Sequence, residues 1–571
     1  MLIGKIVEVR GIKILAKMDK KLPPHIIENG KIIPAPQINS YVKTRVGLDI
    51  IICQIVGEYL KFDNNEDKEI AYLVELEVKG RISNGKFLGG LRLLPIVEAK
   101  IETLDKKDFE IIFYKPTESI KIGKNLFDNS NDISLDINLL IPSHIGIFGN
   151  TGSGKSNTMS KILKEYIEKI DSLPNKNKSK ILIFDLNNEY GGNAICNKDK
   201  KNIFNLSTRK NNDNKIPFDF SNLSAEDWGI ILNATEKTQM PIIRKAYENS
   251  KKDLDVDNHR GLNIIKRIIY NRKNTMFYSI RNYAEQYFEN IDRIKFNGKT
   301  GDFYYDDNNY NLKTLNEIDE LGIRIKPIKN SLDRFEFELL LEIVQRNENG
   351  INFEYISPLM FRMANKKAQL LKIFESSEGE LENNIFKDKN VCVIQLGNVN
   401  KEMKEIIPSL ISNILYDNKT ESKGENDVNS ILNIVIDEAH NLLSSSKEET
   451  EIHGNGLKTF EKIIKEGRKF GVYLMIASQR PSDISTTITS QLQNYFIHKL
   501  VNPNDIEKIR KTVAYMNEAS LNMVTVLGAG ECIISGNALY IPQYAYIDEL
   551  ENEFKPNSAN VKLVGNKGIL E

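Results

Sequence analysis

A glycine-rich octapeptide is the part of this sequence whose residue types and spacing point most directly to chemistry. It runs GNTGSGKS from Gly149 to Ser156 and fits the pattern G-x-x-x-x-G-K-[ST] completely. Its glycines let successive backbone N–H groups converge on phosphate oxygens, Lys155 can reach the β- and γ-phosphates, and the Ser156 hydroxyl can ligate Mg²⁺. The sequence therefore predicts a site for ATP and Mg²⁺. Its predicted nucleotide-binding residues are Gly149, Asn150, Thr151, Gly152, Ser153, Gly154, Lys155, Ser156 and Asn157.

Two carboxylates close a second apolar run. Asp437 and Glu438 follow Ile431–Ile436 directly. The carboxyl end of a strand in a parallel α/β sheet lies beside the phosphate loop. We expect Asp437 to hold the metal, directly or through water, and Glu438 to orient and deprotonate the attacking water. The alternative is an acidic pair that caps the next helix.

A third acidic segment follows the apolar run Ile181–Phe184. It contains Asp185 and Glu189, and its place after a strand predicts that it faces the nucleotide. Either carboxylate could support the metal or the water. On composition alone, turn formation with the neighbouring Asn and Gly residues explains the segment equally well.

A neutral amide and two arginines complete the candidate site. Gln479 follows the apolar run Val472–Ala477, where its amide could hydrogen-bond the γ-phosphate or the water. Arg468 or Arg480 could reach the γ-phosphate of a neighbouring subunit, because guanidinium groups stay charged and bind phosphate oxygens in a fork. A surface salt bridge is an equally good explanation for either arginine.

Apolar runs and turn signals predict the elements that hold these residues. Residues 1–115 contain short Ile-, Val- and Tyr-rich runs and turn dipeptides such as Asn84-Gly85, a pattern typical of a small β-barrel. The runs include Ile3–Val9, Ile50–Val56, Tyr72–Val78 and Glu110–Phe113. Residues 116–223 then show the strand–loop–helix–loop–strand order of a parallel α/β sheet.

Lys155 and Asp437 are 282 residues apart, a separation that requires an insertion in this sheet. Residues 224–382 are mostly helical in pattern and strongly charged, with a polar stretch, Asn297–Asn311, that we expect to be a loop. The predicted helices are Trp228–Asn233, Pro241–Asn249, Leu262–Arg272 and Phe335–Arg346. The α/β pattern resumes over residues 383–540 with further strands at Val391–Leu396 and Tyr495–Leu500, and residues 541–571 are expected to form a tail.

Composition excludes some classes of protein. Lys plus Arg and Asp plus Glu are both 78, so any basic surface that binds nucleic acid must be local. No stretch approaches the about 20 apolar residues of a membrane span, and the N-terminus lacks a signal peptide, so we expect no membrane association. The four cysteines are too far apart for a metal pair and fit a reducing, cytoplasmic compartment.

At this point the motifs resemble the HerA group of the HerA/FtsK ATPases over most of the chain. Any one motif is weak to moderate, but their shared order is highly specific. They are GKIV from Gly4, GNTGSGKS, FDLNNEYGG, Ala234–Gln239, IVIDEAHNLL, EGRKFGV and ASQRPSDI. One departure is Gln395, in a strand where relatives often show Asp-Leu-Ser.

The resemblance implies more than the residues alone. It implies a RecA-like P-loop ATPase core with an N-terminal barrel of the HAS type and a helical insertion. It further implies a homo-hexamer with ATP between subunits and double-stranded DNA in a central pore. Lys155 and Ser156 would bind nucleotide, Glu438 would be catalytic, and Gln479 would sense phosphate. Arg468 would be the trans-acting arginine. A nuclease or other effector would dock on the barrel, in DNA end processing or anti-phage defence.

Two other functions fit parts of the sequence. Residues 437–440 spell DEAH, which indicates a DEAH-type RNA helicase. The wide spacing of the motifs and the lack of a downstream arginine motif oppose this. A nucleotide-gated scaffold that activates an effector with little translocation is the second alternative, and DNA-stimulated ATP turnover with directional movement would distinguish the motor from it.

Overall fold

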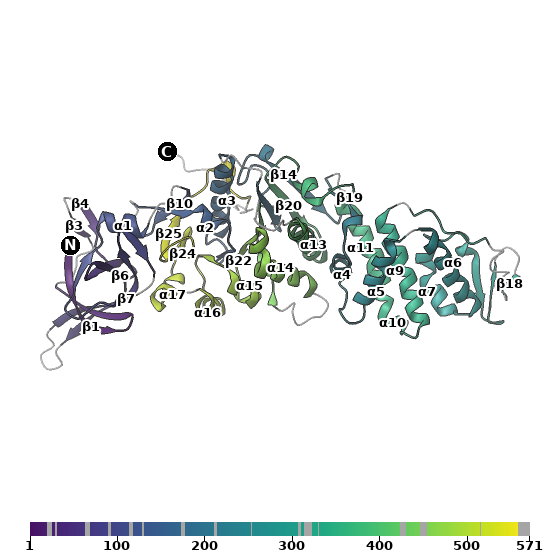
Figure 1. Cartoon of the computed structure of the whole chain (residues 1–571), viewed down its shortest axis with the longest axis horizontal. Coiled ribbons are helices and arrows are strands. Elements are labelled where there is room, and N and C mark those ends of the chain that lie inside the picture. Colours follow the sequence, from purple (N-terminus) through teal and green to yellow (C-terminus); the bar gives the residue numbers. More distant parts are fainter. Residues whose placement is uncertain are drawn as a thin grey trace, which may run out of the picture.

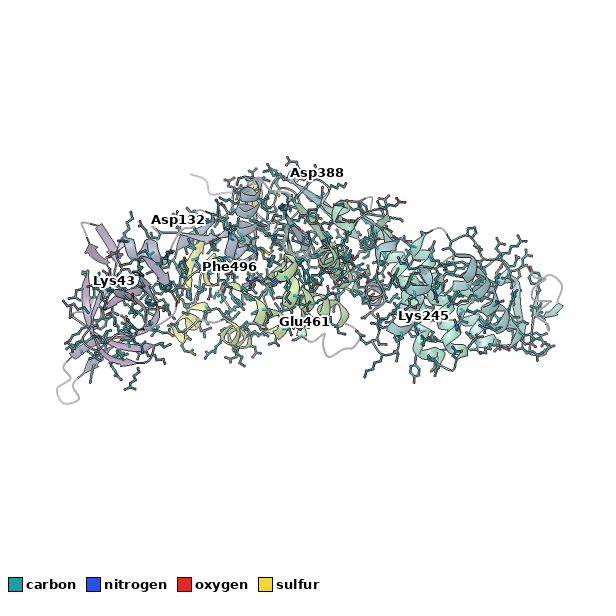
Figure 2. The ribbon with its side chains drawn as sticks, viewed as in Figure 1. Lys43, Asp132, Lys245, Asp388, Glu461 and Phe496 are labelled. Atoms are coloured by element: carbon teal, nitrogen blue, oxygen red, sulfur yellow. The ribbon has the colours of Figure 1, made fainter. Side chains whose placement is uncertain are left out.

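The computed structural model describes residues 1–557 with internal gaps. The residues outside the description are 20–24, 29–30, 63–68, 90–92, 114–117, 128–130, 173–177, 211–213, 253, 306–309, 313–321, 329, 423–429, 446–453, 514–515 and 558–571. The molecule is elongated, with the barrel at one end, the α/β core in the middle and the insertion at the other end (Figure 1). Lys43 marks the barrel, Phe496 the core and Lys245 the insertion in Figure 2.

Six of the described strands close into the N-terminal barrel. Their order around it is β1, β2, β7, β6, β5 and β9, and β1 pairs with β9 to complete the circle. Alternate side chains from these strands fill an apolar interior, and the predicted Asn84-Gly85 turn joins β7 to β8 with positive φ at both residues. The bounds are β1 Leu2–Arg10, β2 Lys13–Met18, β5 Tyr41–Val46, β6 Asp49–Phe62, β7 Glu69–Ser83, β8 Lys86–Leu88 and β9 Lys100–Thr103.

The strand predicted at Glu110–Phe113 is wrong. These residues belong to the end of helix α1 (Lys106–Ile112) and its C-cap. Asp105 and Asp108 form a capping box at the start of α1, and the buried Lys43 ammonium donates to both carboxylates. This N-terminal signal outweighs the β propensity of the apolar residues that follow it.

The core is a mixed sheet of eleven strands in the described part of the chain. The order is β11-β10-β25-β24-β23-β12-β22-β21-β13-β20-β14, and the section from β23 to β14 is parallel. The bounds are β10 Ser119–Asn125, β11 Asp132–Asp136, β12 Ile145–Phe148, β13 Ser179–Asp185, β14 Lys201–Ser207, β20 Val391–Asn398, β21 Ile431–Ile436, β22 Val472–Ser478, β23 Asn494–Ile497, β24 Glu531–Gly536 and β25 Gln543–Ile547.

Helices cover both faces of this sheet. Helix α3 (Lys155–Asp171) packs with one set of alternate strand residues, while α13 (Lys401–Glu421) and α14 (Gly454–Glu466) pack with the other set. The predicted α/β class is therefore confirmed. The segment predicted as a C-terminal tail or brace, residues 541–571, begins with β25, which pairs with β10 and β24 inside the sheet.

The insertion shares its apolar core with one face of the sheet. The Trp228 ring stacks on the Phe335 ring with centroids 3.9 Å apart, and both belong to the cluster that contains α13 and α14. The helices are α4 Ala225–Leu232, α5 Met240–Ser250, α6 Leu254–Tyr270, α7 Asn274–Ala284, α9 Ser331–Glu348 and α11 Pro358–Ile373. Helices α7 and α11 are additions to the predicted set.

The loop predicted at Asn297–Asn311 is wrong for the residues that the structure describes there. Strands β16 (Ile294–Asn297), β17 (Asp302–Tyr305) and β18 (Tyr310–Leu312) form an antiparallel sheet. The buried Phe303 ring packs edge-on against Phe277 and Phe296. Burial of these rings outweighs the turn propensity of the surrounding Asn and Asp residues.

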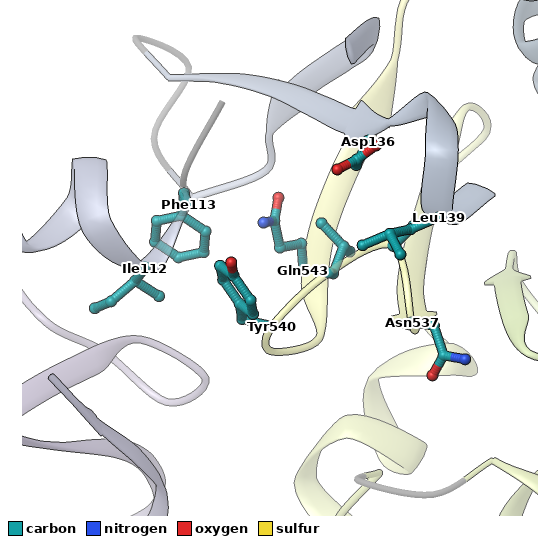
Figure 3. Close-up of a pocket in the computed structure, with 9 residues that line it drawn as sticks. Ile112, Phe113, Asp136, Leu139, Asn537, Tyr540 and Gln543 are labelled. Carbon is teal, nitrogen blue, oxygen red and sulfur yellow. The ribbon is translucent and has the colours of Figure 1, made fainter. Parts of the chain in front are cut away.

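The barrel and the core meet at α1 and the segment that leads into β25. Figure 3 shows a small pocket here between Phe113, Leu139 and Tyr540. The Tyr41 hydroxyl donates to the Pro542 carbonyl at 2.7 Å, and the Tyr544 hydroxyl donates to Asn39 Oδ1 at 2.9 Å. β25 therefore connects the barrel to the sheet that carries the candidate site.

Among the helices that the structure describes, none is both long and apolar enough to span a bilayer. All four cysteines are buried and free.

Candidate active site

The phosphate loop lies between the parallel strand β12 and helix α3, at the carboxyl edge of the sheet. A Cβ at Gly149 would lie 2.5 Å from the His498 Cβ, and one at Gly154, where φ is +109°, would lie 3.1 Å from Gly530. Only glycine fits both positions. Ser153 closes the loop by donating its hydroxyl to the Asn150 carbonyl at 2.7 Å.

Lys155 is the buried cation of this edge. Its ammonium donates to the Asn150 carbonyl at 3.0 Å, and 6% of the residue is exposed. Burial lowers the pKa of the Lys155 ammonium, an effect that nearby carboxylates oppose. Those carboxylates belong to Glu438, Asp437 and Glu189. The structure thus brings the glycine loop and the paired acids together, although they are far apart in the chain.

Asp437 and Glu438 directly follow β21, and their side chains have different surroundings. Asp437 is buried and accepts a hydrogen bond from the Glu438 N–H at 2.9 Å. Burial, and then the Glu189 and Glu438 carboxylates, raise the pKa of Asp437 to about 7. Glu438 has a φ of +50°, an unusual value for a non-glycine residue that turns its side chain toward the loop.

Gln479 links the phosphate loop to Glu438. The Gln479 amide donates to Glu438 Oε1 at 2.5 Å, and its carbonyl oxygen accepts from the Thr151 hydroxyl at 2.6 Å. Glu438 Oε2 is buried without a hydrogen bond and lies 3.4 Å from His440 Nδ1. The predicted sensor amide therefore contacts the predicted base.

The two acids of the third segment have different surroundings. Asp185 is fully buried, and its carboxylate accepts from the Glu189 and Tyr190 N–H groups at 2.8 and 2.9 Å and from Gln395 Nε2 at 3.1 Å. Glu189 instead faces the loop, where burial and then the Asp185 carboxylate raise its pKa, and a hydrogen bond with Ser156 opposes the rise. Glu189 Oε2 is buried without a hydrogen bond.

Gln395, where the family resemblance leads us to expect an aspartate, lies beside Asp185. Its amide donor faces the Asp185 carboxylate, and a Cβ at Gly191 would lie 2.9 Å from the same nitrogen. A carboxylate at this position would instead repel the Asp185 carboxylate. The structure thus assigns Asp185 and Gln395 to holding the turn that presents Glu189.

The two candidate arginines lie at opposite edges of the sheet. Arg480 follows β22 and lies on the side of the phosphate loop. Burial is the main effect that lowers the pKa of His440 there; the Glu438 carboxylate opposes it, and the charge of Arg480 adds to it. Arg468 precedes β22, and its charge acts on His144 and Tyr473 at the amino edge. Both side chains are solvent-exposed. Arg468 is therefore placed away from the phosphate loop of its own subunit.

His498 is a supporting residue that the sequence analysis missed. Its Nδ1 lies 2.8 Å from the Glu531 carbonyl, so Nδ1 donates and Nε2 accepts from the Thr158 hydroxyl at 2.9 Å. Burial lowers the pKa of His498 to about 4, which keeps the ring neutral. The only sequence signal was a histidine in an apolar strand.

The turn before β24 and the segment after β25 also support the loop. Gly530 N–H donates to the Ser153 carbonyl at 3.0 Å. The Asn157 amide donates to the Asp548 carbonyl at 3.2 Å, and Asn557 N–H donates to the Glu189 carbonyl at 2.9 Å. Asn157, predicted to bind nucleotide, thus holds this segment against α3. The tripeptide Gly528-Ala-Gly530 before a strand was the available signal.

The residues at the loop fit an ATP–Mg²⁺ pair. Two buried carboxylate oxygens, on Glu189 and Glu438, lack hydrogen bonds and face the same edge as Lys155 and Asp437. Among the described residues no group of three or more acidic, His or Cys side chains is arranged to hold a metal by itself. Mg²⁺ in nucleotide sites commonly takes one or two protein oxygens and completes its shell with phosphate and water.

The fold and the site define a P-loop ATPase. Residues 120–415, just over half of the chain, match the family described as "Helicase HerA, central domain". This protein belongs to that family and is an ATPase of the helicase type.

Individual relatives agree with the family match. The chain is 26% identical over 472 residues to the DNA double-strand break repair helicase HerA of Sulfurisphaera tokodaii, covering 82% of this chain and 77% of the relative. It is 24% identical over 531 residues to the protein of the same name from Sulfolobus acidocaldarius, covering 90% and 88%. Among solved structures, VirB4 of Thermoanaerobacter pseudethanolicus aligns with a TM-score of 0.42 at 14% identity over 76% of this chain and 98% of that chain. Plasmid coupling protein TrwB with ADP and Mg²⁺ aligns with a TM-score of 0.43 at 10% identity over 78% and 93%.

Proposed function

We propose that this protein is an ATP-hydrolysing, ring-forming translocase that moves double-stranded DNA. The observation that carries the proposal is the convergence of a buried Lys155 with Asp437, Glu438 and Glu189 at one edge of the sheet. A buried ammonium beside one buried and two half-buried carboxylates suits the phosphates and metal of a nucleoside triphosphate.

Each side chain has a role in hydrolysis that follows from its position. The loop N–H groups and the Lys155 ammonium bind the phosphate chain and stabilise negative charge on the γ-phosphate. Glu438 accepts the proton of the attacking water, and Gln479, which contacts both Thr151 and Glu438, detects the γ-phosphate. Ser156 and Asp437 would hold Mg²⁺, supported by Glu189, and this ion would neutralise phosphate charge.

The opposite placement of the arginines supports assembly into a homo-hexamer, which is part of the proposal. Arg468 lies at the amino edge of the sheet, away from the loop of its own subunit. In a ring it would reach the γ-phosphate of a neighbour, with DNA in the central pore. The net charge of zero requires the DNA-binding cations to be concentrated on the pore surface.

A nuclease or other effector is the proposed partner, with the barrel as its docking surface. The two relatives described above carry the name "DNA double-strand break repair helicase", which favours a role in DNA end processing, and we place this role in the cytoplasm. Anti-phage defence is the other setting in which such a motor would act with an effector.

Nucleotide turnover tests the motor. Lys155→Ala should lose ATP binding and turnover, whereas Glu438→Gln should bind ATP and hydrolyse it 10²- to 10⁴-fold more slowly, because a general base contributes roughly that factor. Lys164→Ala, which removes an ion-paired lysine from the same helix, is the matched control and should retain activity. Full activity in Glu438→Gln would remove Glu438 from the proposed role.

Mixing of inactive variants tests the ring. Arg468→Ala and Lys155→Ala should each be inactive, and a mixture of the two should recover activity, because some interfaces then combine an intact loop with an intact arginine. Arg510→Ala, an exposed arginine paired with Glu518, is the control. DNA-stimulated turnover that weakens with salt would support translocation over a static scaffold. Equal turnover with and without DNA would contradict it.

A further inference from the structure

The turn at residues 528–531 brings the C-terminal strands against the phosphate loop. Gly530 N–H donates to the Ser153 carbonyl at 3.0 Å. The Gly530 backbone also lies 3.1 Å from the point where a Cβ on Gly154 would stand. β24 begins at this turn and β25 ends beside it, so both reach the edge of the sheet that carries the loop (Figure 1).

Tyr546 is the exposed aromatic side chain at this turn. It is 39% exposed, whereas the other four residues of β25 are buried. Its ring carbons Cε2 and Cζ lie 3.3 and 3.7 Å from the position of a Cβ on Gly530. The Ile547 N–H donates to the Gly530 carbonyl at 2.9 Å and fixes this arrangement. A single glycine therefore separates the Tyr546 ring from the phosphate loop.

The direction of the bound nucleotide follows from the two sides of β12. On one side, β22 and β21 carry Gln479 and Glu438, so the γ-phosphate lies there. On the other side, β23, β24 and β25 carry Gly530 and Tyr546. A triphosphate that places its terminal group beside Glu438 must leave the loop with its nucleoside toward the second side.

We propose that the Tyr546 ring is a nucleobase-binding surface on which the base of the bound nucleoside triphosphate stacks. The inference rests on the proposed function, because it needs a nucleotide in the loop. Stacking of a base on an aromatic side chain is tolerant of base identity and contributes about tenfold or more to affinity.

Nucleotide binding with and without a base tests this role in the full-length protein. Tyr546→Ala and Tyr546→Leu should raise the dissociation constant for ATP about tenfold, while Tyr546→Phe keeps the ring and binds as wild type. Tripolyphosphate has no base and should compete for the loop equally well in all of these proteins. Tyr355→Ala removes a tyrosine that is 69% exposed in the insertion, and it should change the binding of neither ATP nor tripolyphosphate.

Three results would overturn the inference. Unchanged ATP affinity in Tyr546→Leu would show that the base does not touch the ring. Equal weakening of ATP and tripolyphosphate would show that Tyr546 acts by holding the Gly530 turn. Failure of the wild-type protein to bind either ligand would remove the proposed function itself, and that failure is distinguishable because it precedes any substitution at Tyr546.

Discussion

Replacement of Gln395 by glutamate would place a second carboxylate against the fully buried Asp185 with almost no change in side-chain volume. In the wild-type protein Gln395 Nε2 donates to Asp185 Oδ2 at 3.1 Å, and only 7% of Gln395 is exposed. Gln395→Glu converts this donor into a charged acceptor. The turn that presents Glu189 then contains two like charges in contact and loses one of its three hydrogen bonds to Asp185.

The cost of this substitution can be worked from the distance. Two unit charges about 3 Å apart repel by about 5 kcal/mol at an effective dielectric constant of 20. The pair can escape only by binding a proton, and protonating an ordinary glutamate at pH 8 also costs about 5 kcal/mol. Because the folded variant binds that proton and the unfolded chain does not, stability is lost as pH rises. The loss of unfolding free energy should therefore shrink by about 1.4 kcal/mol for each unit by which the pH is lowered, and it should reach about 2 kcal/mol at pH 6.

Thermal unfolding of the core at pH 6, 7 and 8 measures this dependence. Gln395→Leu is the control, because it removes the hydrogen bond without adding charge and should cost about 1–3 kcal/mol at every pH. A penalty in Gln395→Glu that is independent of pH, or equal to that of Gln395→Leu, would refute the described contact. If Mg²⁺ alone stabilised Gln395→Glu far more than the wild type, Asp185 would be a metal ligand after all.

Three further predictions concern the support of the loop. Thr151→Val should lower kcat about fivefold in an ATPase assay, because Gln479 loses one neutral hydrogen bond, and Thr151→Ser should retain the rate. Burial lowers the pKa of His498 to about 4, so the unfolded chain binds a proton at pH 5 that the folded protein excludes. Acidification from pH 7 to pH 5 should therefore cost about 2 kcal/mol through this residue, and calorimetry of His498→Gln should show a smaller loss. Gly530→Ala should destabilise the core by about 1 kcal/mol or more and raise the KM for ATP, because φ is +82° at this position.

Several elements could be predicted from local pattern alone. The runs Ile145–Phe148 and Ile431–Ile436 coincide with β12 and β21, since short, uniformly apolar segments flanked by turn residues are typical of buried parallel strands. The positions of the phosphate loop and of the paired acids at one edge of the sheet could be predicted because each directly follows one of these strands. The error at Glu110–Phe113 arose because the capping residues before this apolar run determine a helix.

The roles of the third acidic segment could not be predicted from spacing. Asp185 and Glu189 are equally acidic in sequence, but hydrogen bonds inside the turn decide which one faces the phosphate loop. Asp185 accepts from two backbone N–H groups of its own turn, whereas Glu189 keeps a buried oxygen without a hydrogen bond. Gln395, whose contact completes this arrangement, lies 210 residues away in the chain.

The placement of the two arginines limits which γ-phosphate each can reach, and this limit cannot be read from the sequence motifs. Arg468 and Arg480 flank the same strand, β22, and a strand of this length holds its two ends about 20 Å apart. One subunit therefore cannot bring both guanidinium groups to one γ-phosphate. If both act in hydrolysis, Arg480 serves its own loop and Arg468 serves a neighbour, and an isolated subunit is then incomplete even when its loop is intact.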